Sequence, residues 1–252
     1  MTDLTIKRYI LKTLKLNNYK KDYRLMTKLP KYLNDTLIGL LLSDGGLEKS
    51  GEGSNVRLSV IMSIINYGYI LHLYNLFEPY IDSDLKILDI KGSNNVLSTK
   101  MYSTVRFKTI SMPQLLYYYN IFYKKNTIAN KWQKIVPLEL KSSFNAVSLA
   151  HLIMGDGNYL NNRNIIRIYT NSFIKDDVIL LSNIINDNLN IKNKVIHDRN
   201  NQYIIIIEKD SLDKTRLLLL PYMHPSMLYK LGIDTNSIIP HKFDYYNIIN
   251  QI

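Results

Sequence analysis

The chain has 252 residues, a hydrophobic content of 46%, no cysteine and a formal net charge of +11. This length can bury a core in one large domain or two modest ones, and no apolar run approaches the roughly 20 residues that cross a bilayer, so a membrane protein is not expected. The lack of cysteine excludes a disulfide framework and a thiolate zinc site. The positive charge points to a polyanionic partner, first of all nucleic acid, although charge alone also serves solubility.

Residues 1–28 are predicted to form a basic, helical N-terminal extension. Eight lysines and arginines occur in this segment among apolar residues. The first residues lack the basic-then-apolar pattern of a secretory signal, so no such signal is expected.

An internal repeat dominates the rest of the chain, because residues 37–45 recur in altered form as residues 149–157. Each copy is an apolar run, predicted to be helical, that ends in an acidic residue and a glycine. A carboxylate in the last turn of a helix destabilises it unless a cation is nearby, because backbone carbonyls already concentrate negative potential there. Two such ends, at Asp44 and Asp156, indicate paired helices that bring two carboxylates to one metal-binding centre.

The residues before each copy carry the chemistry of a helix start. Asn34, followed by Asp35 and Thr36, is the predicted cap of the first helix, and Asn145 or Ser143 that of the second.

The segments after each copy predict the same order of elements twice, namely helix, two strands, helix, two strands, helix. In the first half the predicted segments are a hairpin turn at 50–54, a strand at 56–60, a helix at 66–80, strands at 85–91 and 102–109, and a helix at 113–123. In the second half they are a hairpin at 159–170, a helix at 176–189, strands at 192–197 and 203–208, and a helix at 212–220. We therefore expect an α+β fold with repeats at 29–123 and 143–235, a basic linker at 124–142 and a C-terminal tail at 236–252.

With these two motifs, the chain resembles the LAGLIDADG homing endonucleases in their single-chain, double-motif form. Residues 132–137 and 221–231 resemble the segments that accompany the motif helices in that family, so the likeness extends from about residue 35 to residue 233. It implies two pseudo-symmetric αββαββα halves, whose antiparallel sheets form a DNA-binding saddle around two central motif helices. The copies are unequal, because His151 stands where the first copy has Gly39, and we expect His151 to pack or hydrogen-bond rather than to bind metal.

The resemblance also implies the chemistry of the centre. Asp44 and Asp156 are the expected catalytic, metal-binding carboxylates, with the backbone carbonyls of Ser43 and Gly155 as further ligands. Oxygen ligands favour Mg²⁺, and Mn²⁺ or Ca²⁺ are expected to occupy the same sites. The candidate catalytic lysines are Lys134, for which Lys131 is a competitor, and Lys230.

DNA contacts are expected on the strands and their turns, because a β-ribbon can enter the major groove with alternate side chains facing the bases. The predicted contact residues are Arg57, Ser59, Arg106, Lys108, Arg163, Arg167, Tyr169, Lys192, Lys194 and Arg199.

The resulting hypothesis is a monomeric, site-specific homing endonuclease that uses a divalent metal to hydrolyse both strands of a long, asymmetric double-stranded DNA target, leaving short 3′ overhangs. The alternative is an intron maturase that binds structured intron RNA without cleaving DNA, since fold alone does not exclude that role. A purely structural basic protein would explain the charge but not the repeated acids. Abundant tyrosine, isoleucine, asparagine and lysine indicate an A+T-rich genome and hence an organellar, most of all mitochondrial, origin.

Overall fold

The computed structural model describes residues 17–91, 101–126 and 130–234. The expected C-terminal tail at 236–252 and the first 16 residues of the N-terminal extension lie outside the described residues. Within the described part of the chain, no helix has the length and apolar character needed to span a membrane.

Two halves with the same order of elements form an α+β fold, as predicted. The first half consists of α3 (Lys31–Leu41), β1 (Gly45–Lys49), β2 (Val56–Ser63), α4 (Tyr67–Leu76), β3 (Lys86–Lys91), β4 (Met101–Lys108) and α5 (Leu116–Phe122). The second consists of α7 (Ala146–Asp156), β7 (Gly157–Leu160), β8 (Ile165–Ile168), α8 (Lys175–Leu189), β9 (Asn193–His197), β10 (Tyr203–Ile207) and α9 (Lys209–Leu219). The predicted αββαββα order is therefore confirmed in each half.

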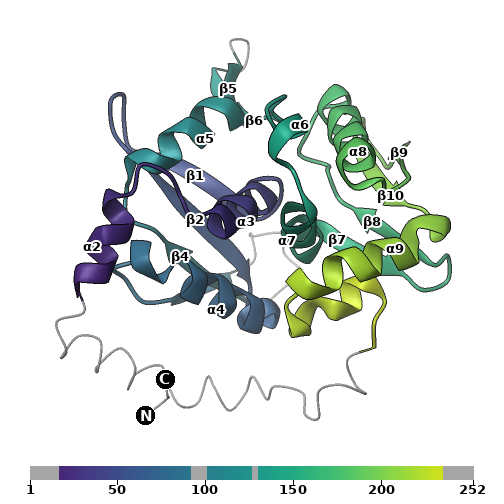
Figure 1. The fold of residues 1–252 in the computed structure, drawn as a ribbon, viewed down its shortest axis with the longest axis horizontal. Coiled ribbons are helices and arrows are strands. Elements are labelled where there is room, and N and C mark those ends of the chain that lie inside the picture. Colours follow the sequence, from purple (N-terminus) through teal and green to yellow (C-terminus); the bar gives the residue numbers. More distant parts are fainter. Residues whose placement is uncertain (1–16, 92–100, 127–129, 235–252) are drawn as a thin grey trace.

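Each half builds one four-stranded antiparallel sheet with equivalent topology. The strand order is β1-β2-β4-β3 in the first half and β7-β8-β10-β9 in the second. The sheets flank α3 and α7, which pack against each other at the centre of the molecule (Figure 1). Each sheet's first strand follows its central helix directly, so the end of each central helix lies beside its own sheet.

The alternation of polar and apolar residues explains which face of each sheet is buried. In β2, the residues at 56, 58, 60 and 62 belong to the core, while Arg57 and Ile61 are exposed on the other face. Strand β10 is a nearly continuous isoleucine run, and Ile205 and Ile207 face the same core. One face of each sheet is therefore left for contacts outside the core.

The segment predicted as a basic linker contains regular structure. Strands β5 (Tyr123–Asn126) and β6 (Lys131–Lys134) form an antiparallel hairpin, and the short helix α6 (Leu140–Ser143) precedes α7. This hairpin holds Lys134 in a fixed register opposite Tyr123.

Part of the basic extension forms the helix α2 (Asn17–Leu25), which packs on the first half. The Arg24 side chain donates to the carbonyl of Pro79 at 2.9 Å and to Asp82 at 2.6 Å. Gln114 donates to the carbonyls of Arg24 and Met26. The described part of the extension thus stabilises the outer side of the first half.

Several predicted boundaries were wrong. Helix α3 begins at Lys31, directly after Pro30, because proline is readily accepted where a helix begins; Asn34 therefore lies inside the helix and does not cap it. It ends at Leu41, so Asp44 lies in the following turn. Strand β9 begins one residue later than predicted, at Asn193, and α9 three residues earlier, at Lys209.

The predicted cap of the second motif helix is confirmed. The side chain of Asn145 accepts hydrogen bonds from the backbone N–H groups of Val147 at 2.9 Å and Ser148 at 3.3 Å. Helix α7 continues through Asp156, so the two acidic residues end their helices differently.

Candidate functional site

The contact between α3 and α7 depends on two complementary pairs of residues. A Cβ added to Gly39 would lie 2.4 Å from the carbonyl oxygen of Ser148 and 2.6 Å from the Cβ of His151. A Cβ added to Gly155 would lie 2.6 Å from the Cβ of Ser43. Gly39 and His151 occupy equivalent positions in the two motifs, as do Ser43 and Gly155. In each pair, one half of the molecule supplies a glycine, and the other half supplies the side chain that packs over that glycine.

His151 is buried between the halves in a hydrogen-bonded position, as expected. Its Nε2 lies 3.1 Å from the Thr36 hydroxyl, and its Nδ1 lies 2.7 Å from the Tyr69 hydroxyl. Burial, together with the charge of His72, lowers the pKa of His151 to about 3. The imidazole is therefore neutral, and it links the second half to two residues of the first.

The two motif acids lie close together at the ends of these helices. Asp44 keeps more exposed surface than the half-buried Asp156, although protein atoms surround both carboxylates closely enough to desolvate them. The Asp44 carboxylate lies beside Gly155, where an added Cβ would be 3.2 Å from Oδ2. Desolvation raises the pKa of Asp44, although Lys230 and Lys134 oppose the shift. Desolvation and then the charge of Asp44 raise the pKa of Asp156 to about 7, so this centre concentrates negative charge that a cation would relieve.

A lysine approaches each motif end from a separate element. Lys134 of β6 donates to the carbonyl of Gly45 at 2.7 Å, with the carbonyl of Ser43 at 3.5 Å. Lys230 belongs to a 3₁₀ segment (Pro225–Leu231) and donates to the carbonyls of Met154 at 2.6 Å and Gly155 at 2.5 Å.

These ammonium groups supply the cations that the helix-end carboxylates require. Burial lowers the pKa of Lys134 to about 8 and also lowers that of Lys230, while both aspartates oppose these shifts. The competing candidate Lys131 is exposed on the same strand, and among the described residues its side chain forms no hydrogen bond with either motif end.

The donor set at this centre fits a hard divalent cation. Asp44 and Asp156 supply carboxylate oxygens, and the carbonyls of Ser43 and Gly155 adjoin them. Within the described residues, no cluster of three or more histidine, aspartate, glutamate or cysteine side chains forms a metal site. Two carboxylates nevertheless suit Mg²⁺, which commonly binds one or two carboxylates and fills its remaining positions with water and phosphate oxygens.

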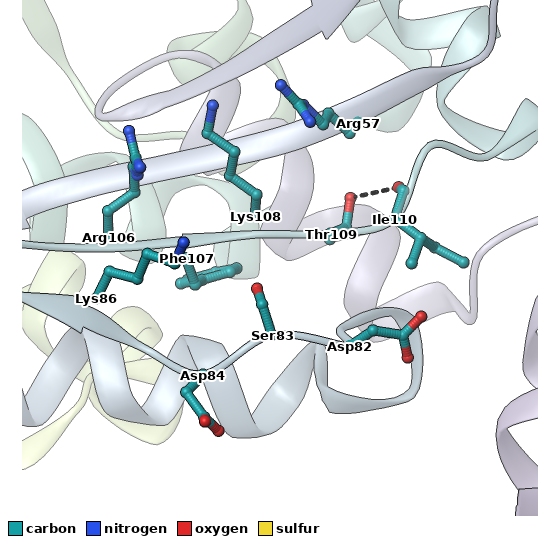
Figure 2. Close-up of a pocket in the computed structure, with 10 residues that line it drawn as sticks. All are labelled: Arg57, Asp82, Ser83, Asp84, Lys86, Arg106, Phe107, Lys108, Thr109 and Ile110. Atoms are coloured by element: carbon teal, nitrogen blue, oxygen red, sulfur yellow. Dashed lines mark hydrogen bonds between the residues drawn. The ribbon is translucent and has the colours of Figure 1, made fainter.

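The outer face of the first sheet is strongly basic. Register places Ser59 opposite Lys108, and Arg106 opposite both Ile61 and Lys86. Figure 2 shows Arg57, Arg106 and Lys108 projecting to one side of a pocket that these residues help to line. The four predicted contact residues of this half therefore share one face, on which Ser59 is buried by its neighbours.

The outer face of the second sheet carries fewer charges. Arg167 lies opposite Asn158 on one side and Ile206 on the other, and Lys194 lies opposite Ile206. Lys194 pairs with Glu208 at 2.6 Å. The predicted contact residues outside these strands are all exposed, and they are Arg163 in the β7–β8 turn, Tyr169 after β8, Lys192 before β9 and Arg199 in the β9–β10 turn.

Two polar atoms on these outer faces occupy equivalent positions and have no hydrogen-bond partner among the described residues. They are the buried Oγ of Ser59 and Nε of Arg167. Ser59 lies opposite Gly46 and Arg167 opposite Asn158, each two residues after a motif acid. Buried polar atoms are normally paired, so both are positioned to receive a ligand or water.

No feature of the sequence pattern pointed to Glu48, an acidic residue on the basic face of the first sheet. Its Oε2 accepts from Arg57 Nε at 2.8 Å and from Lys108 Nζ at 2.8 Å. Its significance depends on the pairing of β1 with β2 and of β2 with β4, which residue spacing alone does not reveal.

The model of the LAGLIDADG DNA endonuclease family matches residues 35–215, which is more than half of the chain. The chain belongs to this family. It is 35% identical over 152 residues to intron-encoded endonuclease ai4 of Dictyostelium discoideum, covering 58% of this chain and 87% of that protein. It is 25% identical over 207 residues to DNA endonuclease I-ChuI of Chlamydomonas applanata, covering 79% of this chain and 93% of that protein.

Other relatives of this LAGLIDADG protein are named maturases rather than endonucleases. Cytochrome b mRNA maturase bI2 of Saccharomyces cerevisiae is 27% identical over 200 residues, which cover 78% of this chain but only 46% of the maturase. The chain thus spans about half the length of that relative. Among solved structures, the homing endonuclease I-WcaI bound to its DNA recognition sequence aligns with a TM-score of 0.75 and 25% identity, covering 85% of this chain and 92% of that one.

Proposed function

We propose that this LAGLIDADG protein is a site-specific endonuclease that hydrolyses both strands of duplex DNA with a divalent metal ion. The observation that carries the proposal is the pseudo-symmetric centre, in which two acids at adjoining motif ends are each accompanied by a separate lysine. The basic outer faces of the sheets support duplex DNA as the substrate, as do relatives named DNA endonucleases.

Asp44 and Asp156, with the carbonyls of Ser43 and Gly155, would hold the metal. A bound Mg²⁺ would polarise the scissile phosphate and stabilise charge on the leaving 3′ oxygen. Lys134 and Lys230 would each stabilise the negative charge that develops at one scissile phosphate, or orient the attacking water there. Two such sites would cut opposite strands and leave short 3′ overhangs.

The remaining parts of the proposal concern the target and the origin of the chain. The two sheets present different side chains, so we propose that one chain binds a long asymmetric target as a monomer. Relatives named as intron-encoded, together with relatives named cytochrome b mRNA maturases, support an intron of an organelle as the source, and we propose the mitochondrion.

A screen of a randomised duplex library tests this function, since it detects cleavage and defines the target together. With that target, Asp44→Asn and Asp156→Asn should each lower the cleavage rate in Mg²⁺ by at least about a hundredfold, because each removes a metal-binding charge. DNA affinity measured in Ca²⁺ should fall far less. Asp187→Asn, on the exposed side of α8, is the matched control and should cut normally. Normal cutting by both motif variants would contradict the proposed centre.

Intron maturase remains the second candidate, since two relatives are named cytochrome b mRNA maturases. That function needs binding to structured intron RNA and does not require two acids with two lysines. Selective binding to such RNA, combined with no cleavage of any library duplex in Mg²⁺, would reverse the order of the two candidates.

A further inference from the structure

Glu48 connects three strands across the outer face of the first sheet. It lies on β1 directly opposite Arg57 of β2, and Lys108 of β4 lies opposite the neighbouring Ser59. A single carboxylate oxygen, Oε2, accepts from both cations at 2.8 Å. Desolvation raises the pKa of Glu48, but the hydrogen bonds and charges of Lys108 and Arg57 outweigh it and lower the pKa overall. The carboxylate is therefore ionised at neutral pH.

Stability does not explain this arrangement well. The side chains of Glu48 and Arg57 are 39% and 45% exposed, and ion pairs at such exposure contribute little to folding. A carboxylate on a face that meets DNA also repels phosphates and weakens binding. The position of Glu48 is better explained by an effect on the two cations that it holds.

The geometry determines which donors of Arg57 stay available. Glu48 occupies Nε, so the two terminal amino groups of the guanidinium keep the parallel fork that matches O6 and N7 of guanine. The side chains of Arg106 and Lys86, which lie opposite each other on the same face, form no hydrogen bond or ion pair with any described residue. Two cations of this face are thus held in place, while two others remain adjustable.

We propose that Glu48 is a positioning residue, which holds the Arg57 side chain, with Lys108 beside it, in the orientation that contacts a guanine. That guanine would lie in the half of the DNA target that the first sheet covers, which we call its half-site. This inference rests on the proposed function. Ordering the guanidinium before DNA arrives lowers the entropic cost of forming the bidentate contact. It also restrains Arg57 from bonding to the nearest phosphate, which would carry no sequence information.

A binding selection from randomised duplexes in Ca²⁺ tests the role without depending on cleavage. The wild-type chain should select guanine at one base pair of that half-site, and Arg57→Ala should remove the preference. Glu48→Gln keeps the side-chain size but not the charge, and it should lower the preference for guanine at that base pair by about tenfold. Glu52→Gln, in the exposed turn of the same hairpin, is the matched control and should leave the preference unchanged.

A double-mutant cycle separates positioning from a direct contact made by Glu48. In the Arg57→Ala background, Glu48→Gln should cause no further change at the guanine position. An unchanged preference in Glu48→Gln, or additive losses in the double variant, would overturn the inference while leaving the endonuclease proposal intact. A wild-type chain that selects no duplex sequence would overturn both.

Discussion

Each lysine of the centre donates hydrogen bonds to the backbone carbonyls of one motif end, and among the described residues neither lysine bonds to the other end. Lys134 contacts the end of the first motif and Lys230 the end of the second, and the two lysines come from segments almost one hundred residues apart. A single shared lysine could not serve two scissile phosphates on opposite strands in equivalent geometry. The pairing therefore divides the proposed centre into two sites that can be impaired separately.

Replacing one lysine should impair the cleavage of one strand more than that of the other. We expect Lys134→Met to slow one strand by roughly a hundredfold, because an ammonium that stabilises developing charge contributes about that factor. Supercoiled plasmid carrying the target should accumulate as nicked circles, and end-labelled duplex should show which strand stays intact.

Lys230→Met should leave the opposite strand intact. Lys131→Met is the control for Lys134, since Lys131 lies exposed on the same strand, β6, and should allow both strands to be cut. Equal slowing of both strands by each motif-end variant would contradict the division into two sites.

The sequence predicted the residues of this centre better than it predicted their contacts. Asp44 and Asp156 were identifiable because they recur at the ends of matched apolar runs. The choice between Lys131 and Lys134 could not be made, since it depends on the register of the β5–β6 hairpin. Glu48 was missed because its significance comes from Arg57 and Lys108, which are distant in the chain and become neighbours only through strand pairing.

Among the elements, the packing of α3 on α7 determines where the two acids lie. Glycine inside a helix is normally about 1 kcal/mol less favourable than alanine. Gly39 therefore lowers the intrinsic stability of α3. The close approach of α7 explains its presence, since the missing Cβ leaves room for the Ser148 carbonyl and for His151.

This explanation predicts the sign of a substitution. Gly39→Ala should lower the free energy of unfolding by about 1–3 kcal/mol, because the new methyl group overlaps backbone and forces the helices apart. Urea unfolding followed by circular dichroism measures the change. Gly51→Ala, in an open turn with no atom within 4 Å of the added Cβ, should change stability little. A more stable Gly39→Ala variant would show that the close contact does not exist in solution.

At the element level, the sequence predicted order better than boundaries. Alternating residues located β2, because only a half-buried strand gives that period. The start of α3 was misplaced because Asn34 and Thr36 favour caps, while Pro30 and the packing of the whole helix decided the outcome. The β5–β6 hairpin was not predicted, since its basic residues gave no apolar alternation.

Over the whole molecule, a group of histidines lies where the halves meet. His151 of α7 stacks on Tyr69 of α4, and His72 of α4 lies 5.3 Å, ring centre to ring centre, from His224 of the second half. Burial, aided by the charge of His72, lowers the pKa of His224 to about 4. Protonation of this group therefore opposes the association of the halves.

The pH dependence of stability should show this effect with a defined sign. Unfolded histidine titrates near pH 6.5, whereas His151 in the folded chain has a pKa of about 3. Between these two pKa values the unfolded state binds more protons than the folded state. The contribution of neutral His151 to the free energy of unfolding is therefore complete above about pH 7 and is lost as the pH falls. From pH 7 to pH 5 the loss from His151 is roughly 2 kcal/mol.

Asp156 has the opposite effect, because its raised pKa stabilises the folded chain on acidification. The two effects are separated by measuring the free energy of unfolding in urea at pH 7 and at pH 5, for the wild type and for His151→Gln. The change between the two pH values is then compared between the two chains. The variant should lose less stability on acidification, by roughly 2 kcal/mol. His197→Gln, exposed on β9, should behave as wild type. An identical pH response in all three chains would exclude this role for His151.

The complementary pairs at the centre have a consequence for the ancestry of the chain. A first half paired with a copy of itself would place glycine opposite glycine and serine opposite serine, leaving a void at one level and crowding at the other. A second half paired with itself would bring two histidines together where the structure accommodates one. If the chain arose by duplication of a symmetric dimer, the two halves have since become complementary at these positions, and a chimera should exchange positions 39 with 151 and 43 with 155 as matched sets.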